Sequence, residues 1–377
     1  MDNLKVPLSK PNPDISKFLD IMRGRIQPEK PPLVEYTIDD AIMRPVVEGM
    51  LGKKWINTSD LGKSLGSQIN LSKDNIENVK IWLNNQIAFW YHMGYDFIRV
   101  EFGLELPADA RITTDTAPAA SGKNRTWNET TKGPILSWED FEKYPWPEVE
   151  DSIFFPYEYI STHLPEGMGF MASYEAGVFE HLSRLFGYEG LCVNIMDNFD
   201  LVKEVTDKIG NIFRNYYQKL LQINNLAAIF QGDDLGFNTG TLISPEHIRE
   251  LILPWHKEFA KMAHDKGLPY FLHSCGNIES VFEDLINYVG IDGKHSFQDG
   301  TAPIARAKEL YGERIALLGG VDMDKLSRLE PEELRSYVRD IIDKCNIGGR
   351  FAIGAGNSIP SYIPLENYLT MLDEAFK

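Results

Sequence analysis

The chain has 377 residues, of which 43% are hydrophobic and 25% are charged, with a net charge of −17 at neutral pH. These values are typical of a globular protein and exclude a disordered or low-complexity chain. The negative charge disfavours binding to nucleic acid or to an anionic membrane surface, because both carry the same sign of charge. Three widely spaced cysteines do not form a disulfide framework. No secretory signal and no membrane-spanning apolar run is found, so we expect a cytoplasmic protein.

Short apolar runs recur along the chain and are typical of buried strands. None alternates with period two, which is expected when both faces of a parallel sheet are covered. Eight such runs are predicted as strands, at residues 32–36, 96–101, 169–174, 227–231, 269–273, 291–295, 315–319 and 351–354.

Helical patterns separate most of these strands. The predicted helices cover residues 74–93, 199–223, 245–266, 332–345 and 366–376. Eight successive β–α units favour an α/β fold in the form of a single (β/α)8 TIM barrel, with a doubly wound open sheet as the alternative.

Two segments depart from the regular β–α alternation within the single domain expected over residues 1–377. Residues 1–30 form an N-terminal extension before the first strand. Residues 102–157 form a long loop or hairpin after the second strand, rich in Thr, Ser, Gly, Asn and Pro. Long loops in compact domains are commonly functional, so we expect a lid or a docking surface there, with an unstructured tip as the alternative.

Polar side chains gather where the predicted strands end, which is where barrels of this type carry their active sites. His273 and Cys275 end the fifth strand two residues apart. Both can turn toward one ion, and an imidazole with a thiolate suits zinc. The alternative is a buried histidine beside a cysteine that only fills space.

A zinc site needs at least one more ligand. Cys345 is expected at the opposite end of the barrel, and Cys192 in the packing of a helix. The third ligand is therefore expected from carboxylates or from another histidine. We favour Asp234 or Glu175, followed by His295, and each of these also has an ordinary interpretation as a salt-bridged rim residue.

Other polar residues at these strand ends suit substrate binding. Asp233, in the segment GDDLG, can accept hydrogen bonds or pair with a cation, or it can stabilise the start of a helix. Asn357 and Ser358 can hold a substrate or form a capping turn. No dinucleotide fingerprint, P-loop or G-x-S-x-G elbow is found in the sequence.

Several of these segments carry a family resemblance. GDDLGFNTGTLISPEHIRELILPWHKE, PYFLHSCGNI, IALLGGVDMDKL and FAIGAGNSIP resemble the uroporphyrinogen decarboxylase superfamily, most clearly from about residue 225 onward. The R-Q-A-G-R segment of true decarboxylases is missing after the first strand, so the corrinoid-dependent methyltransferase branch is the better match. Members of that branch that act on coenzyme M hold zinc with H-x-C and a later cysteine, and this chain has Ala355 at the later position.

The resemblance implies a (β/α)8 barrel that moves a methyl group between a small substrate and the cobalt of a separate corrinoid protein. Zinc would be held by His273, Cys275 and Asp234, with Glu175 and His295 as further catalytic candidates. In such a site Tyr174 and Asn357 would orient the substrate. The missing cysteine favours the donor side of the reaction, such as demethylation of an O-methyl compound.

Two other functions stay open. One is a metal-free decarboxylase of a small or tetrapyrrole-like carboxylic acid, and the other is a non-catalytic barrel that binds a small molecule or a corrinoid protein. The sequence is compatible with a homodimer but does not predict one.

Overall fold

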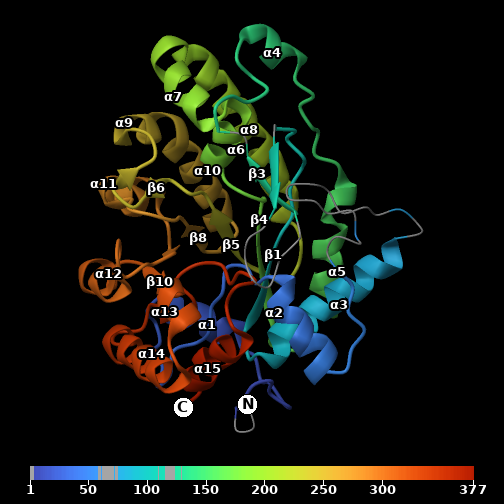
Figure 1. The fold of residues 1–377 in the computed structure, drawn as a ribbon, viewed down its shortest axis with the longest axis vertical. Coiled ribbons are helices and arrows are strands. Elements are labelled where there is room, and N and C mark those ends of the chain that lie inside the picture. Colours follow the sequence, from blue (N-terminus) through green and yellow to red (C-terminus); the bar gives the residue numbers. More distant parts are fainter. Residues whose placement is uncertain are drawn as a thin grey trace.

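The computed structural model describes residues 4–57, 61, 72, 75–108, 110–114, 124–128 and 130–377, and shows a mixed α/β fold around one curved sheet (Figure 1). Every strand pair in this sheet is parallel. In spatial order its strands are β1 (Phe97–Glu101), β4 (Gly169–Ser173), β5 (Leu226–Gly232), β8 (Tyr270–His273), β9 (Gly293–His295), β10 (Ala316–Leu318) and β11 (Phe351–Ala352). The strand order follows the chain order, as the predicted β–α series requires.

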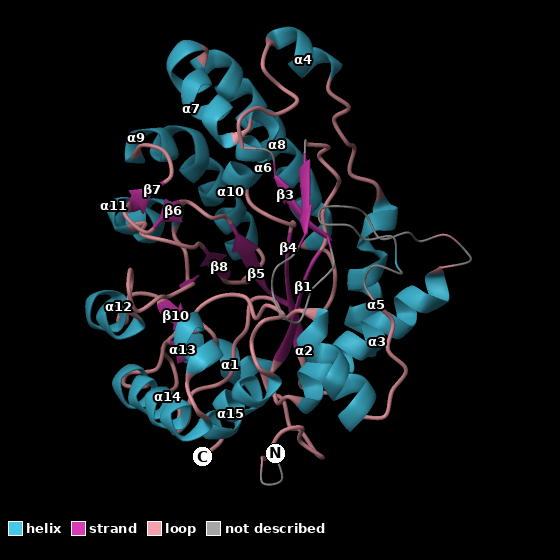
Figure 2. Cartoon of the chain, in the orientation of Figure 1, coloured by secondary structure: helices cyan, strands magenta, loops and turns pink. Residues whose placement is uncertain are grey.

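Helices surround the strands on the outside of the sheet (Figure 2). The helical segments are α1 (Ile15–Met22), α2 (Asp40–Arg44), η1 (Pro45–Met50), α3 (Ile76–His92), α4 (Trp138–Lys143), η4 (Asp151–Phe154), α5 (Phe155–His163), α6 (Val178–Phe186), α7 (Tyr188–Asp197), α8 (Phe199–Leu220), α9 (Pro245–His247), η5 (Ile248–Ile252), α10 (Leu253–His264), α11 (Glu279–Asp284), η6 (Leu285–Val289), α12 (Ile304–Tyr311), α13 (Met323–Arg328), α14 (Pro331–Cys345) and α15 (Leu365–Ala375). None of the helices in the described part of the chain is both long enough and apolar enough to cross a membrane.

The apolar strands are buried on both faces, as predicted. All residues of β4 and β5 are buried, and so are those of β8. A parallel strand of this kind has the inside of the curved sheet on one side and helices on the other, so an apolar residue is favoured at every position.

The first predicted strand, residues 32–36, is much shorter than expected. It forms a single parallel bridge, between Leu33 and Ile353, so the sheet has seven strands in the described residues instead of eight. Ile353 N donates to Pro32 O, and Val34 N donates to Ile353 O, both at 2.9 Å. Proline has no N–H, so Pro31 and Pro32 cannot donate to extend the ladder.

The predicted helix at 245–266 is divided into three segments, α9, η5 and α10. Pro254 lies one residue after the start of α10. It offers no N–H to the preceding turn, and η5, a turn of π-helix, lies directly before it. The predicted helical stretch is therefore present from Pro245 to His264, with one turn of π-helix inside it.

The segment 102–157 contains an antiparallel hairpin, β2 (Ala110–Thr114) with β3 (Asn124–Asn128), followed by α4 and η4. Residues 109, 115–123 and 129 of this segment lie outside the described residues. A second, very short hairpin joins β6 (Gly236–Phe237) to β7 (Gly240–Thr241) directly after β5.

The start of the described chain is attached to its end. Lys5 N donates to Asp373 Oδ1 at 2.8 Å, and Lys5 Nζ donates to Phe376 O at 2.8 Å. The described start of the chain and the C-terminal helix α15 both lie in the lower part of Figure 1.

Candidate metal centre

Three metal-ligand side chains meet at the carboxyl end of the sheet. Their ligand atoms, from Asp234, His273 and Cys275, all lie within 4.8 Å of one another. The register of the sheet explains the meeting, because Gly232 of β5 pairs with His273 of β8. Asp234 and Cys275 each lie two residues beyond this pair, so they leave the sheet side by side.

The loop geometry holds these three residues together through the backbone. Cys275 N donates to Asp234 Oδ1 at 2.8 Å. His273 Nε2 lies 3.4 Å from Cys275 Sγ and 3.6 Å from Asp234 Oδ1. Atoms bonded to one tetrahedral zinc at about 2.0–2.3 Å lie roughly 3.3–3.6 Å apart, so these two separations match the edges of such a site.

A second histidine fixes the orientation of the first. His273 Nδ1 lies 2.7 Å from His295 Nδ1, and His295 Nε2 lies 3.1 Å from Ala355 O. The carbonyl can only accept, so His295 carries its proton on Nε2 and its Nδ1 accepts from His273 Nδ1–H. His273 Nε2 is therefore left with its lone pair toward Cys275 and Asp234, as a metal ligand requires.

Burial disfavours charge on each member of this cluster when no cation is bound. Burial lowers the pKa of His273 well below its usual value and that of His295 to about 3, so both rings are neutral. Burial also raises the pKa of Cys275 to about 12 and raises that of Asp234. A bound divalent cation reverses the last two effects and holds the thiol as thiolate.

Two polar side chains contact the sulfur. Asn357 Nδ2 donates to Cys275 Sγ at 3.3 Å, and Ser296 Oγ lies 4.0 Å from the same atom. Asn357 Oδ1 accepts from Ser358 N at 2.7 Å, which fixes the amide orientation. Asn357, predicted to bind substrate, thus donates a hydrogen bond to the Cys275 sulfur. Ser358, the next residue, is half-buried.

The other predicted site residues lie outside this cluster. Tyr174 is fully buried, stacks on Phe213, and its hydroxyl bonds to the backbone of Leu104 at 3.0 Å. These contacts place Tyr174 in the packing of the core, and its role in orienting a substrate stays a prediction. Glu175 supplies none of the three ligand atoms, although its backbone oxygen accepts from His181 Nε2 at 2.9 Å.

Asp233 caps a helix, which was the alternative interpretation of this residue. Its carboxylate accepts from Phe179 N and Glu180 N at 3.1 Å each, at the start of α6. His256 Nε2 lies 2.9 Å from Asp233 Oδ2, and both side chains are fully buried. These contacts support the helix interpretation, while a contact with substrate stays a prediction.

Cys345 lies buried at the end of α14, before β11 and so at the opposite end of the sheet, as expected. Cys192 is exposed on α7, and its predicted place in helix packing was wrong.

The structure adds a neighbouring group to which the sequence assigned no role. The Tyr36 ring stacks on the His273 ring, with centroids 4.0 Å apart and planes 12° apart. The Arg99 guanidinium carbon lies 3.6 Å from the Tyr36 ring centroid. Gly232 makes room for this arrangement, because a Cβ there would overlap the Tyr36 hydroxyl.

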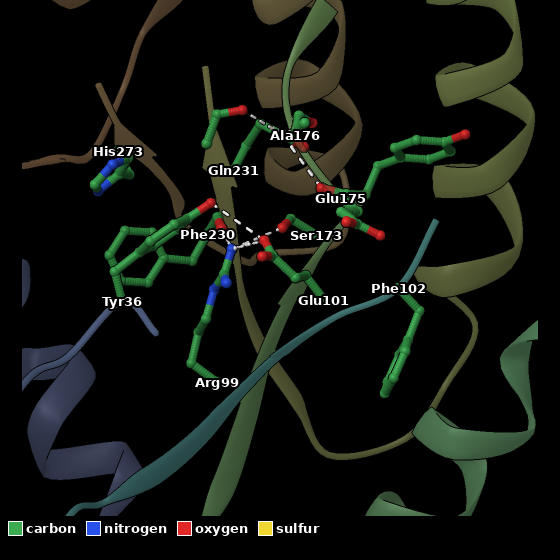
Figure 3. Close-up of polar contacts among 12 residues, drawn as sticks. Tyr36, Arg99, Glu101, Phe102, Ser173, Glu175, Ala176, Phe230, Gln231 and His273 are labelled. Carbon is green, nitrogen blue, oxygen red and sulfur yellow. Dashed lines mark hydrogen bonds and ion pairs between the residues drawn. The ribbon is translucent and has the colours of Figure 1, made fainter. Parts of the chain in front are cut away.

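Arg99 is buried within a polar network (Figure 3). Its Nη2 donates to Glu101 Oε2 at 2.6 Å, Ser173 Oγ at 3.0 Å and Phe230 O at 3.1 Å. The Tyr36 hydroxyl donates to the same Glu101 oxygen at 3.2 Å. Tyr36, Arg99 and Glu101 lie at or near the ends of predicted strands, and this was the only feature of the sequence that could have pointed to them. Their contacts depend on how neighbouring strands align, which the sequence does not show.

Comparisons with known proteins agree with this architecture. Residues 129–377 match the uroporphyrinogen decarboxylase (URO-D) family. A methylated-thiol–coenzyme M methyltransferase of Methanosarcina mazei is 28% identical over 152 residues, which is 40% of this chain and only 38% of that relative. A solved methyltransferase structure from Methanosarcina mazei superposes with a TM-score of 0.68 at 15% identity, over 97% of this chain and 99% of that one. The family match covers well over half of the sequence, and the chain belongs to the uroporphyrinogen decarboxylase family.

Proposed function

We propose that this protein is a zinc-dependent methyltransferase that moves a methyl group between a small molecule and the cobalt of a separate corrinoid protein. The observation that carries the proposal is the cluster of Asp234, His273 and Cys275, with His273 Nε2 turned toward the other two. The names of the similar proteins, both methyltransferases, support the same reaction class.

The donor set fits zinc. One nitrogen, one sulfur and one carboxylate oxygen form a three-ligand set of the kind that catalytic zinc sites use, with the fourth position left for substrate. When bound there, zinc supplies Lewis acidity to the heteroatom that carries the methyl group.

The residues around the cluster orient and balance it. His295 holds His273 in the ligating tautomer, and Asn357 donates to the sulfur, which favours the thiolate. Asp234 and Cys275 contribute two negative charges, which balance a divalent cation in a partly dry site. Because the two negative ligands balance the cation, the site has little excess positive charge to attract a polycarboxylate, which fits an uncharged methyl donor better.

On the substrate, we propose an O-methyl compound as the donor. The related enzyme named above acts on methylated thiols by its name, and the position of the third expected cysteine is Ala355 here. In the proposed reaction the carbon–oxygen bond breaks, the methyl group passes to the reduced cobalt of the partner, and the oxygen keeps the electron pair.

The test combines metal content with methyl transfer. Purified protein should carry about one zinc per chain, and His273→Ala and Cys275→Ala should lose it. Incubation with reduced corrinoid protein and a panel of aryl and alkyl methyl ethers should change the corrinoid absorbance as cobalt is methylated, in the wild type only. Metal-free protein that releases CO2 from a carboxylic acid would refute the proposal and support a decarboxylase.

A further inference from the structure

Tyr36 packs directly against the ring of His273 but supplies none of the three ligand atoms of the cluster. The two rings are nearly parallel, with centroids 4.0 Å apart and planes 12° apart (Figure 3). The guanidinium carbon of Arg99 lies 3.6 Å from the centroid of the same Tyr36 ring. Two groups this close to one centroid would overlap on a single face, so Tyr36 lies between His273 and Arg99.

Tyr36 is itself buried and held in place on several sides. Its hydroxyl donates to Glu101 Oε2 at 3.2 Å, and the Phe230 ring meets its ring in a T-shaped contact with centroids 5.3 Å apart. Gly232 leaves no space beside the hydroxyl, because a Cβ at that position would overlap it. Tyr36 therefore presents one fixed face to His273 and can act as a rigid support for that ring.

A histidine needs such a support if it is to bind a metal in one orientation. The last torsion of a histidine side chain has broad preferences, so the rotamer alone does not set the ring plane. The hydrogen bond between His273 Nδ1 and His295 Nδ1, at 2.7 Å, fixes one corner of the ring but leaves the ring able to tilt about that corner. The Nε2 lone pair lies in the ring plane, so a tilt would turn it away from Cys275 Sγ at 3.4 Å and Asp234 Oδ1 at 3.6 Å.

We infer that Tyr36 is a positioning residue of the metal centre. Its ring fixes the plane of His273, while His295 fixes the direction within that plane, and together they aim Nε2 at the other two ligands. Arg99 strengthens the arrangement, because a guanidinium is attracted to an aromatic face and here holds the Tyr36 ring against His273. The inference rests on the proposed zinc site but not on the identity of the methyl donor.

The test compares zinc affinity and the absorption spectrum of bound cobalt in two variants. Co²⁺ takes the place of zinc, and its visible bands report the geometry of the ligands. Tyr36→Leu removes the stacked ring, so His273 can tilt, and it should weaken zinc binding by roughly three- to tenfold and shift the cobalt bands. Tyr36→Phe keeps the ring and loses only the hydroxyl, so its zinc affinity and cobalt spectrum should stay close to those of the wild type.

Tyr159→Leu is the matched control. Tyr159 stacks on His163 with centroids 3.8 Å and planes 11° apart, so this variant loses a tyrosine–histidine stack of the same geometry. Both residues belong to α5, which ends before β4 begins, and the variant should bind zinc and cobalt as the wild type does. Urea unfolding of the metal-free proteins is measured alongside, because a purely structural role for Tyr36 would lower the free energy of unfolding and leave the cobalt bands unchanged.

The outcomes separate this inference from the proposed zinc site. A Tyr36→Leu protein with the zinc affinity and the cobalt spectrum of the wild type would overturn the inference and leave the zinc site standing. An equal loss in Tyr36→Phe would overturn it too, because the hydroxyl and not the ring would then be responsible. If Tyr36→Leu fails to fold, Tyr36→Met fills more of the space with a flexible chain and must show the same loss. A wild-type protein that binds neither zinc nor cobalt would refute the proposed site, and this inference with it.

Discussion

Replacing His295 by phenylalanine isolates the effect of orientation on metal binding. Phenylalanine keeps the ring but removes the acceptor, so His273 Nδ1–H loses the partner that it has at 2.7 Å. His273 is then free to place its proton on Nε2, which abolishes the lone pair that faces Cys275. Removing a partner of this kind weakens metal binding by about 10- to 100-fold, or roughly 1.4–2.7 kcal/mol.

The assay is a zinc competition titration against a chromophoric chelator, with urea unfolding of the metal-free proteins measured alongside. His295→Gln should recover part of the affinity, because its amide oxygen can accept from His273. His163→Phe is the matched control: that ring also bonds an acceptor, Tyr159 O at 2.8 Å, but it lies at the end of α5, before β4. Its zinc affinity should equal that of the wild type.

The result that refutes this reasoning is specific. If His295→Phe binds zinc within about twofold of the wild type while Cys275→Ala binds none, then His295 does not orient the ligand. If both variants and the wild type bind no zinc at all, the cluster is not a zinc site.

Three further predictions concern the groups around the cluster. Gly232→Ala pushes a methyl group into the Tyr36 hydroxyl and should lower the free energy of unfolding by about 1–3 kcal/mol in urea, an effect that Tyr36→Phe should partly relieve. Burial raises the pKa of Glu35 well above its usual value. The folded protein therefore keeps a proton that the unfolded chain releases above about pH 4.3. The free energy of unfolding should fall as the pH rises from that point. Glu35→Gln should remove that part of the slope, at most about 1.4 kcal/mol per pH unit, and an unchanged pH profile of the urea midpoint would contradict it. Asp233→Asn should lower the free energy of unfolding by about 1–2 kcal/mol, because the start of α6 loses part of its cap, and should leave the zinc affinity unchanged. Loss of zinc binding without loss of stability would show instead that Asp233 belongs to the metal site.

The strands could be predicted because burial on both faces leaves a direct trace in the sequence. Runs such as 227–231 and 269–273 correspond to β5 at Leu226–Gly232 and β8 at Tyr270–His273. The strand predicted at 32–36 forms only a single bridge. Its side chains are as apolar as those of a strand, but Pro31 and Pro32 have no N–H to donate to the neighbouring strand, and a count of apolar residues does not register this.

The cluster was only partly predictable. His273 and Cys275 are two residues apart on one strand end, and their spacing alone placed them together. The choice among Asp234, Glu175 and His295 depended on distances between strands. The register between β5 and β8 brings Asp234 beside Cys275, and the register between β8 and β9 sets His295 behind His273. No local pattern in the sequence encodes either alignment.

The alanine at position 355 links the sequence departure to the structure. Members of the resembling branch that act on coenzyme M have a cysteine at this position, whereas here the Ala355 carbonyl accepts a hydrogen bond from His295. In the proposed zinc site, a carboxylate from Asp234 would carry the same charge as the missing thiolate, so the three-ligand set would still balance a divalent cation. An oxygen ligand in place of sulfur also leaves a harder site. In the proposed zinc site, the absence of this cysteine would change the softness of the site while its charge stayed the same, and this supports the proposal of an oxygen-bound methyl group over a thiol.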